Sequence, residues 1–336
     1  MSRMARRPAV KSEGAFRFLD LKPHVEDFRA AVVHGLSTRP KSLPPKFFYD
    51  SRGSELFNRI CETPEYYVTR TELAMLDAIG PEIAALAGPA ASVIEFGCGS
   101  ADKIKKLLAA LGAPTDYVAI DISRDHLLRS VDEIAIDFAE VNVSAVCADF
   151  LQPFPLPEAF CMGAGRRLAF FPGSTIGNQT PDEALDFLKL VRSIVARAGA
   201  SKRGALLIGV DLKKDEDILN AAYNDAAGIT AKFNLNLLHR MKNELDLDVD
   251  PADFAHRAFY NADLGRIEMH LVSRRAQQLS LNGRAFTFAP GETIHTENSY
   301  KYELAEFAAL AGRAGFKVLK SWTDPAHLFS IHFLEA

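Results

Sequence analysis

The sequence has no excess of positive charge: 39 lysines and arginines stand against 43 aspartates and glutamates, a formal net charge of −4 over 336 residues. A nucleic-acid surface needs clustered cations to neutralise phosphates, so we expect no nucleic-acid partner. No apolar run approaches the roughly 18 residues that cross a bilayer, which predicts no membrane partner. The basic N-terminus lacks the apolar core of a secretory signal, and we expect residues 1–14 to form a flexible tail.

Cysteine is also scarce. The four cysteines show no CxxC pattern and no histidine at metal-ligand spacing, so we expect reduced structural thiols and no metal. The remaining composition, 48% hydrophobic and 24% charged, is ordinary for a globular protein. The length predicts two domains, or one large domain with insertions, and the whole is typical of a cytoplasmic enzyme.

A glycine turn follows the first strongly apolar run. Residues 93–103 read VIEFGCGSADK, in which Glu95 closes the run and Gly97 begins the turn. Asp121 closes the next apolar run, and Asp149 closes the one after that. Acids at the ends of successive strands behind a glycine turn are typical of a nucleoside site, because an acid about 20 residues on can accept hydrogen bonds from ribose hydroxyls.

Strand-like runs alternate with helical ones, which predicts an α/β fold with a doubly wound parallel sheet. The predicted strands are 92–97, 117–121, 143–148, 167–172 and 204–211, and the predicted helices are 101–111, 124–139, 181–198 and one near 301–313. Runs 315–323 and 328–335, joined by a short turn, predict a C-terminal antiparallel hairpin. Such a hairpin is the Rossmann-like arrangement of S-adenosylmethionine-dependent methyltransferases, whereas a dinucleotide-binding sheet would normally end in another parallel strand.

The third glycine of a dinucleotide turn is replaced by Asp102. A carboxylate at that helix N-terminus would repel a diphosphate. S-adenosylmethionine carries no phosphate, and its sulfonium and ammonium are positive. We therefore predict S-adenosylmethionine as the methyl donor, with no metal.

Two stretches lie outside the predicted sheet. We expect residues 15–75 and 213–300 to fold together as an inserted α+β substrate-binding domain, and 76–212 with 301–336 to form the methyltransferase domain. The second insertion begins with a helical region broken at Gly228 and continues as β-alternating pieces. Open α/β sheets bind ligands at the carboxyl ends of their strands, where this domain would supply the substrate pocket.

Several longer segments resemble the histidine-specific Nα-methyltransferases of ergothioneine biosynthesis. They are LPPKFFYDSRGSELFNRICETPEYYVTRTE (43–72), EFGCGSADK (95–103), FFPGSTIGNQTP (170–181), AYNDAAGITAKFN (222–234), RIEMHL (266–271) and HTENSYKY (295–302). The resemblance covers roughly residues 20–336. It implies transfer of three methyl groups from S-adenosylmethionine to the α-amino group of L-histidine, which gives the betaine hercynine.

The resemblance also implies a cofactor site. Gly97 would approach the methionine portion, Asp121 the ribose and Asp149 the adenine amino group, with Phe150 packed on the base. Lys103 would join this site, although a solvated lysine beside Lys105 and Lys106 is the alternative. Glu95 would either orient the loop or contact the methionine ammonium.

For the substrate, the resemblance implies that the Gly173 carbonyl accepts from the amine with Tyr49 nearby as a hydrogen-bonding partner. Asn178 and Tyr223 would hold the carboxylate, unless Asn178 is only a turn residue and Tyr223 only a core aromatic. Glu297 and Ser299, which alternate and so share one face of a strand, would bind the imidazole together with Tyr66 and Met269. Composition alone would place Glu297 on a solvated strand face.

Some positions depart from the family's pattern. Cys98 stands where serine or threonine is common, and Val68 where proline is common. For His270 and His295 we expect local structural roles. Besides a histidine methyltransferase, two hypotheses remain: a methyltransferase of this fold acting on another amino acid or amine, and a catalytically silent binding protein. We expect a monomer, because the second domain already covers the active edge.

Overall fold

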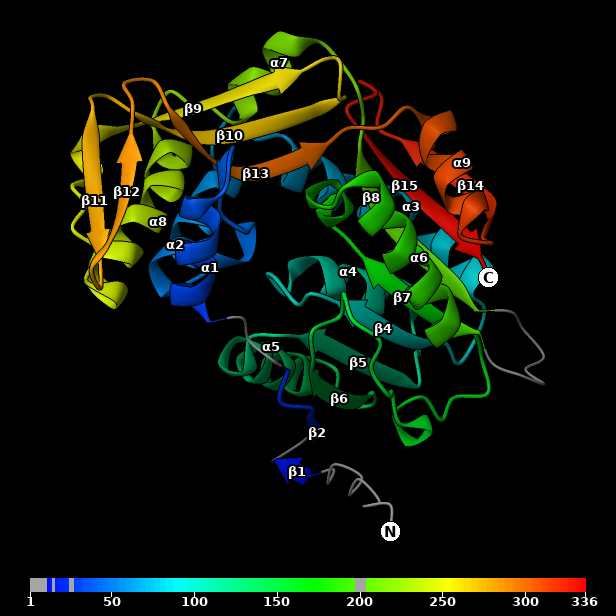
Figure 1. Ribbon diagram of the computed structural model, residues 1–336. Coiled ribbons are helices and arrows are strands. Elements are labelled where there is room, and N and C mark those ends of the chain that lie inside the picture. The colour runs from blue at the N-terminus through cyan, green and yellow to red at the C-terminus, as the bar shows by residue number, and fades with distance from the viewer. Residues whose placement is uncertain (1–10, 14–15, 24–26, 197–203) are drawn as a thin grey trace.

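The structure, a computed structural model, describes residues 11–13, 16–23, 27–196 and 204–336, and it is built around one large sheet (Figure 1). The nine strands of this sheet have the order β1-β2-β6-β5-β4-β7-β8-β15-β14. Their bounds are β1 (Lys11–Glu13), β2 (Phe16–Asp20), β4 (Ser92–Phe96), β5 (Asp116–Asp121), β6 (Asn142–Cys147), β7 (Arg167–Phe171), β8 (Ala205–Asp211), β14 (Lys317–Thr323) and β15 (Phe329–Glu335).

The centre of the sheet is parallel from β6 to β8, and β15 inserts antiparallel between β8 and β14. The five predicted parallel strands and the C-terminal hairpin are therefore confirmed. A strand pair that reverses direction in this way completes the methyltransferase arrangement of a doubly wound sheet. The order changes direction at β4, which is the switch point where such sheets hold their ligands.

Helices cover both faces of the large sheet. Their bounds are α3 (Val68–Ala87), α4 (Asp102–Leu111), α5 (Arg124–Asp137), α6 (Pro181–Val195) and α9 (Leu304–Arg313). Neighbouring residues of β4 point to opposite faces: Val93 packs in one core cluster with α3, α4 and α5, whereas Ile94 packs in a second with α6 and α9. Strands buried on both faces explain the continuous apolar runs of the sequence.

The N-terminal edge of the sheet differs from our expectation. Residues 16–20, assigned to the substrate domain, form β2, which pairs parallel with β6. Lys11–Glu13, assigned to the flexible tail, forms β1 and pairs antiparallel with β2. The other residues of the predicted tail lie outside the described residues. A paired strand covers the open edge that β6 would otherwise present, and sequence periodicity carries no signal for such an edge.

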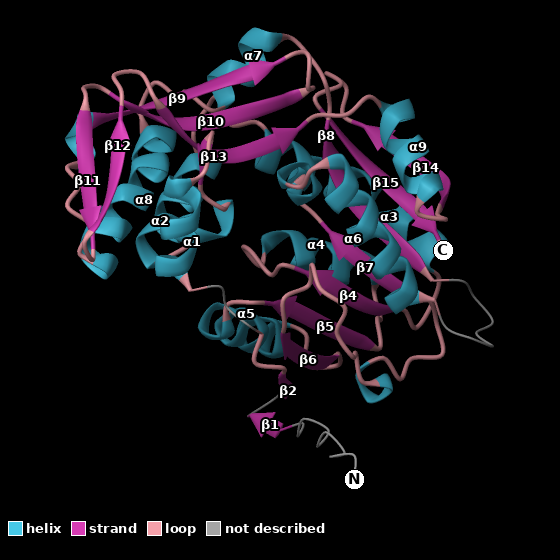
Figure 2. Ribbon diagram, viewed as in Figure 1, coloured by secondary structure: helices cyan, strands magenta, loops and turns pink. Residues whose placement is uncertain are grey.

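A second group of elements lies to one side of the large sheet (Figures 1 and 2). It holds a four-stranded sheet of order β3-β13-β10-β9 and a β11–β12 hairpin. The elements are α1 (Phe28–Ser37), β3 (Lys41–Ser42), α2 (Ser51–Cys61), α7 (Glu216–Ala222), α8 (Ile229–Leu245), β9 (Phe254–Asn261), β10 (Arg266–Ser273), β11 (Gln277–Leu281), β12 (Arg284–Phe288) and β13 (Thr293–Tyr300).

The two insertions meet in this second group, because β3 pairs parallel with β13. The predicted helix break is confirmed at Gly228, whose left-handed backbone begins α8. The upstream boundary differs from residue 75, since α3 begins at Val68 and packs against α4 and β15 of the large sheet. Among the described residues, no helix is long and apolar enough to cross a membrane.

Candidate active site

The carboxyl ends of β4 to β8 lie at one edge of the large sheet, and the turn after β4 begins there with Gly97. The Gly97 N–H donates to the Ile120 carbonyl at 2.8 Å, and its φ of +77° lies in the region that favours glycine. A Cβ at this position would lie 3.5 Å from the Phe150 ring. The turn therefore presents bare backbone beside an aromatic ring, as the approach of a cofactor requires.

Asp121, at the end of β5, holds the two turns beside it. Its Oδ2 accepts from the Cys98 N–H at 3.1 Å, and its Oδ1 accepts from the Ser123 N–H at 2.7 Å. The Cys98 thiol is 3.7 Å from the same carboxylate, so the departure from serine or threonine keeps a polar contact. Burial raises the pKa of Asp121, and the hydrogen bond from Ser123 opposes that rise.

Asp149 and Phe150 follow β6 on the same edge. The Asp149 Oδ1 accepts from the Leu151 N–H at 3.0 Å, which fixes the turn. The Phe150 ring packs edge-on against Phe96 and Phe171 at 6.3 and 6.0 Å between centroids. The predicted adenine side of the site thus combines the Asp149 carboxylate with the Phe150 ring, which neighbouring rings hold in place.

Glu95 is buried at the end of β4, where the Tyr117 hydroxyl donates to its Oε2 at 2.5 Å. Burial raises the pKa of Glu95 to about 8, against the lowering effect of the Tyr117 hydrogen bond. A carboxyl with this pKa ionises readily when a cation arrives. The structure is compatible with both predicted roles, because Glu95 lies directly before the Gly97 turn.

Glu72, on α3, is a site residue that sequence reasoning missed. Its buried carboxylate pairs with the Lys103 ammonium at 2.6 Å and accepts from the Gly173 N–H at 2.9 Å. Gly173 has φ of +78°. Gly209 leaves the space that Glu72 fills, because a Cβ there would lie 2.1 Å from its Oε1. Glu72 closes the segment PEYYVTRTE, but its spacing in the sequence gives no sign of these contacts.

Three of the residues predicted for the substrate lie on one face of β13 and β10. Glu297 lies directly opposite Met269 in the register of the two strands, and Ser299 lies opposite Ile267. Met269 and Ser299 are buried, whereas Glu297 is half-buried. Burial raises the pKa of Glu297 to about 7, and the positive charge of Lys301 opposes the rise. The predicted shared face of Glu297 and Ser299 is present.

Aromatic rings from both insertions adjoin this face. The Tyr66 ring packs edge-on against Tyr223 at 6.3 Å, and Tyr49 packs against Phe233 at 5.7 Å. Tyr66 and Tyr223 are buried, but Tyr49 is 44% exposed. Since Tyr49 comes from the first insertion and Tyr223 from the second, the two stretches build one wall.

Asn178 ends a short 3-10 helix, η3 (Thr175–Asn178), that follows Gly173. This helix packs against β13, and Gly177 is required there because a Cβ would lie 2.7 Å from the Tyr300 carbonyl oxygen. Asn178 is half-buried at this junction. The turn that carries Gly173 is thereby joined to the substrate strand.

A buried ion network, also missed from the sequence, lies beneath the substrate face. Asp211, at the end of β8, pairs with Lys301 at 2.7 Å and with Lys214 at 2.6 Å, and Tyr67 donates to its Oδ1 at 2.9 Å. The Asp211 side chain has no exposed surface. Burial raises the pKa of Asp211, but the charges of Lys301 and Lys214 outweigh burial and leave that pKa lowered.

The other face of β10 and β13 carries Glu268, His270 and His295, whose ligand atoms lie close enough to hold a metal ion. The Glu268 carboxylate is already engaged by Arg266 at 2.8 Å and by His270 at 3.0 Å. The two histidine rings stack with centroids 4.8 Å apart. An adjacent guanidinium and stacked imidazoles favour the local structural roles that we expected for the histidines.

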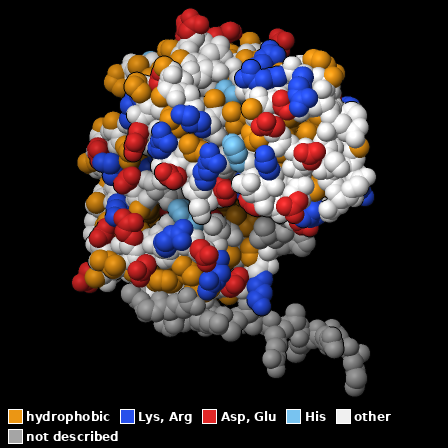
Figure 3. Space-filling model, turned by 90° about the vertical axis from the view of Figure 1, so that its left-hand side faces the viewer, with side chains coloured by type: hydrophobic (Ala, Val, Ile, Leu, Met, Phe, Trp, Pro, Cys, Tyr) orange, Lys and Arg blue, Asp and Glu red, His pale blue; other side chains and the backbone are white. Residues whose placement is uncertain are grey.

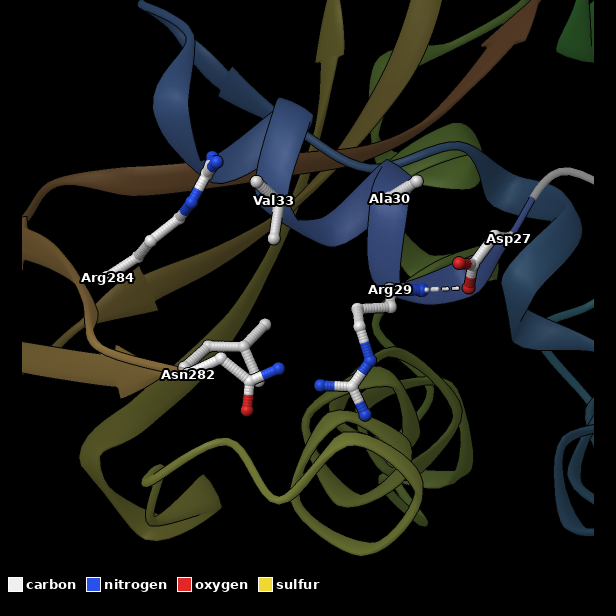
Figure 4. A pocket seen from close by; sticks show the side chains of 7 residues that line it. Asp27, Arg29, Ala30, Val33, Asn282 and Arg284 are labelled. Carbon is white, nitrogen blue, oxygen red and sulfur yellow. Dashed lines mark hydrogen bonds between the residues drawn. The ribbon is translucent and has the colours of Figure 1, made fainter.

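A hollow of about 300 Å³ lies elsewhere, between α1 and the β11–β12 turn (Figure 4). It is lined by Asp27, Arg29, Ala30, Val33, Leu281, Asn282 and Arg284. None of the predicted site residues lines this hollow. Charged side chains of both signs are interspersed on the face shown in Figure 3, as the near-neutral composition predicts.

All four cysteines are free, and three of them are buried. Burial raises the pKa of Cys147 to about 11 and that of Cys161 to about 12. A thiol with a raised pKa carries little thiolate and is chemically inert. The prediction of reduced structural thiols is confirmed for these positions.

Comparison with known proteins adds to this geometry. The profile of a family described as histidine-specific, S-adenosylmethionine-dependent methyltransferases matches residues 28–336. The histidine N-alpha-methyltransferase of Mycolicibacterium smegmatis is 39% identical over 91% of this chain and 94% of its own length. Ergothioneine biosynthesis protein 1 of Schizosaccharomyces pombe is 28% identical over 87% of this chain but only 38% of its own length.

A relative named for a different substrate is also similar. The 4-dimethylallyltryptophan N-methyltransferase easF of Claviceps fusiformis is 27% identical over 91% of each chain. The family profile spans nearly all of the described structure, including most of the first insertion and all of the second. The chain therefore belongs to the family of histidine-specific, S-adenosylmethionine-dependent methyltransferases.

Proposed function

We propose that this enzyme transfers three methyl groups from S-adenosylmethionine to the α-amino nitrogen of L-histidine and so forms hercynine. The observation that carries the proposal is the placement of Glu297 and Ser299 on one face of β13, beside the strand ends of the large sheet. A carboxylate and a hydroxyl on one face suit the two nitrogens of an imidazole. Met269, opposite Glu297, supplies the apolar contact for the ring.

The cofactor would lie along the strand ends. Gly97 would admit the methionine portion, Asp121 would accept from the ribose hydroxyls, and Asp149 with Phe150 would hold the adenine. Asp102 in the first turn of α4 disfavours a diphosphate at that helix N-terminus. When bound, S-adenosylmethionine supplies an electrophilic methyl group on a sulfonium.

The protein's own part in the reaction is to orient the amine. The α-ammonium of the substrate must lose a proton before its nitrogen can attack, and the Gly173 carbonyl would accept from the remaining N–H. Glu72 holds the N–H of Gly173 and thus the position of this turn. Tyr49 would be a hydrogen-bonding partner. Asn178 would hold the carboxylate beside Tyr223, whose own hydroxyl donates to Ser299 at 2.8 Å. Correct placement of nitrogen and methyl carbon supplies most of the rate.

The two insertions would act as the substrate-binding part, and the large sheet with α3 to α6 as the cofactor-binding part. We also propose that the enzyme works as a monomer in the cytoplasm. The free, buried cysteines support a reducing compartment.

The test is mass spectrometry of products after incubation of the enzyme with S-adenosylmethionine and a mixture of the common amino acids. We expect a histidine species with three added methyl groups and no other methylated product. A methylated product from another amino acid would keep the cofactor and overturn the role of Glu297. Bound cofactor without any product would contradict the proposed substrate altogether.

A further inference from the structure

Lys301 has its ammonium buried at the centre of the substrate side. Its Nζ donates to Asp211 Oδ2 at 2.7 Å, to the Ser299 hydroxyl at 2.8 Å and to the Tyr223 hydroxyl at 3.2 Å. The side chain is 1% exposed. An ammonium has three donors and no acceptor, so these contacts use all of its protons.

This arrangement fixes what the neighbouring hydroxyls can do. The Tyr223 and Ser299 oxygens are 2.8 Å apart, and both already accept from Lys301. One of the two hydroxyls donates to the other, which leaves a single hydroxyl proton without an acceptor. Within the described part of the chain, neither hydroxyl has any further hydrogen-bond partner. The remaining proton is therefore available only to a ligand.

Glu297, on the same strand, supplies a hydrogen-bond acceptor. It lies two residues from Ser299 on the same face of β13, and once ionised its carboxylate oxygens accept hydrogen bonds. The site thus presents one acceptor and one donor side by side. A neutral imidazole has one N–H and one nitrogen lone pair and matches this pair, whereas an indole has an N–H alone and a phenyl ring has neither.

We propose that Lys301 is a specificity-determining positioning residue, which makes the Tyr223–Ser299 hydroxyl pair a donor to the unprotonated imidazole nitrogen of the substrate. The inference rests on the proposed function, since it takes histidine as the substrate and β13 as its ring-binding face. Without Lys301, the hydroxyls could accept as well as donate, and the site would lose its preference for a ring nitrogen with a lone pair.

The experiment compares Lys301→Met with Lys214→Met. Both substitutions remove an ammonium paired with Asp211, but Lys214 contacts Asp211, Tyr67 and the Leu212 carbonyl rather than the two hydroxyls. Dissociation constants are measured by calorimetry for L-histidine and for β-(2-thienyl)-L-alanine, whose ring of similar size has neither N–H nor nitrogen lone pair. The preference for histidine is the ratio of the two constants.

We expect Lys301→Met to lower that preference by about 10-fold, as the loss of a ligand hydrogen bond predicts, and Lys214→Met to leave it within about twofold. A structural role alone would weaken both ligands equally, so an unchanged ratio in Lys301→Met would overturn the inference.

Ser299→Ala leaves the Lys301–Asp211 pair in place and serves if Lys301→Met does not fold. It should lose a similar preference, and the double variant should lose no more than Ser299→Ala does. A Ser299→Ala enzyme with its full histidine preference would overturn the inference. Wild-type enzyme that does not bind histidine would instead refute the proposed function, and the inference with it.

Discussion

The proposed cofactor side of the active site and its proposed substrate side are held by different kinds of contact. On the cofactor side, the Gly97 N–H donates to the Ile120 carbonyl, and the Asp121 carboxylate accepts from the Cys98 N–H. These contacts join the ends of neighbouring parallel strands. On the substrate side, Ser299 and Tyr223 are held by Lys301, and Lys301 is held by Asp211 from the large sheet. One side depends on turn geometry, the other on a buried ion network that joins both parts of the molecule.

The largest expected effect follows from breaking the ion network. Asp211→Asn would leave Lys301 and Lys214 buried without a carboxylate, and we expect a loss of about 3–5 kcal/mol in the free energy of unfolding. Urea denaturation measures it. Asp121→Asn, the matched change on the cofactor side, should cost about 1 kcal/mol or less. Equal losses in the two variants would remove the proposed difference between the two sides.

The next effect concerns the contact between the sides. Glu72→Gln keeps the shape of the side chain but removes the charge that holds Lys103, and we expect kcat to fall about 10- to 100-fold through misplacement of the Gly173 turn. Steady-state kinetics measures this change. Asp77→Asn, on the same helix but 60% exposed and paired with Lys106, should change kcat less than twofold. A Glu72→Gln enzyme with normal kcat would exclude the positioning role.

Two substitutions should each affect the binding of only one ligand, histidine or the cofactor. Glu297→Ala should raise the KM for histidine about 10-fold or more and leave cofactor affinity nearly unchanged, because the lost acceptor faces only the substrate. Asp121→Ala should lower the affinity for the cofactor and leave the affinity for histidine nearly unchanged. Steady-state kinetics gives the KM for histidine, and calorimetry gives the affinity for each ligand. Parallel losses of the two affinities in either variant would contradict the assignment.

The smallest expected effect is the release of a proton from Glu95 when the cofactor binds. Glu95, with a pKa of about 8, is mostly protonated at pH 7, and a neighbouring ligand ammonium would lower that pKa and release its proton. Cofactor binding should then release close to one proton at pH 7 and almost none at pH 9, where the carboxyl is already ionised. Calorimetry in buffers of different ionisation enthalpy counts the protons. The same release from Glu95→Gln would assign it to another group.

The sequence predicted the sheet around the proposed cofactor side well because its signals are local. Each of the central strands β4 to β8 is a short apolar run, and Glu95, Asp121 and Asp149 each close one of these runs. The parallel arrangement then brings the ends together without further information. Two adjacent β-rich runs likewise predicted the C-terminal hairpin, and the antiparallel pairing of β14 with β15 confirms it.

The substrate side was predicted through resemblance, and its supporting residues were missed. Glu72 and Lys301 lie in segments that carry the resemblance, and Asp211 ends a predicted strand, but nothing in their spacing indicates that they are buried partners. Their pairing joins positions far apart in the chain, which periodicity cannot report. The edge strand β2 was missed for a similar reason, because its pairing with β6 depends on the whole intervening chain.

The pairing of β3 with β13 has a consequence for synthesis on the ribosome. Lys41 emerges early, but its partner Ile294 is made near the end of translation. Domains fold as the chain emerges, and strand pairings between distant segments wait for the later one. The sheet that carries Glu297 and Ser299 thus cannot be completed until nearly the whole chain has been made, so translation products that end before β13 would lack both residues.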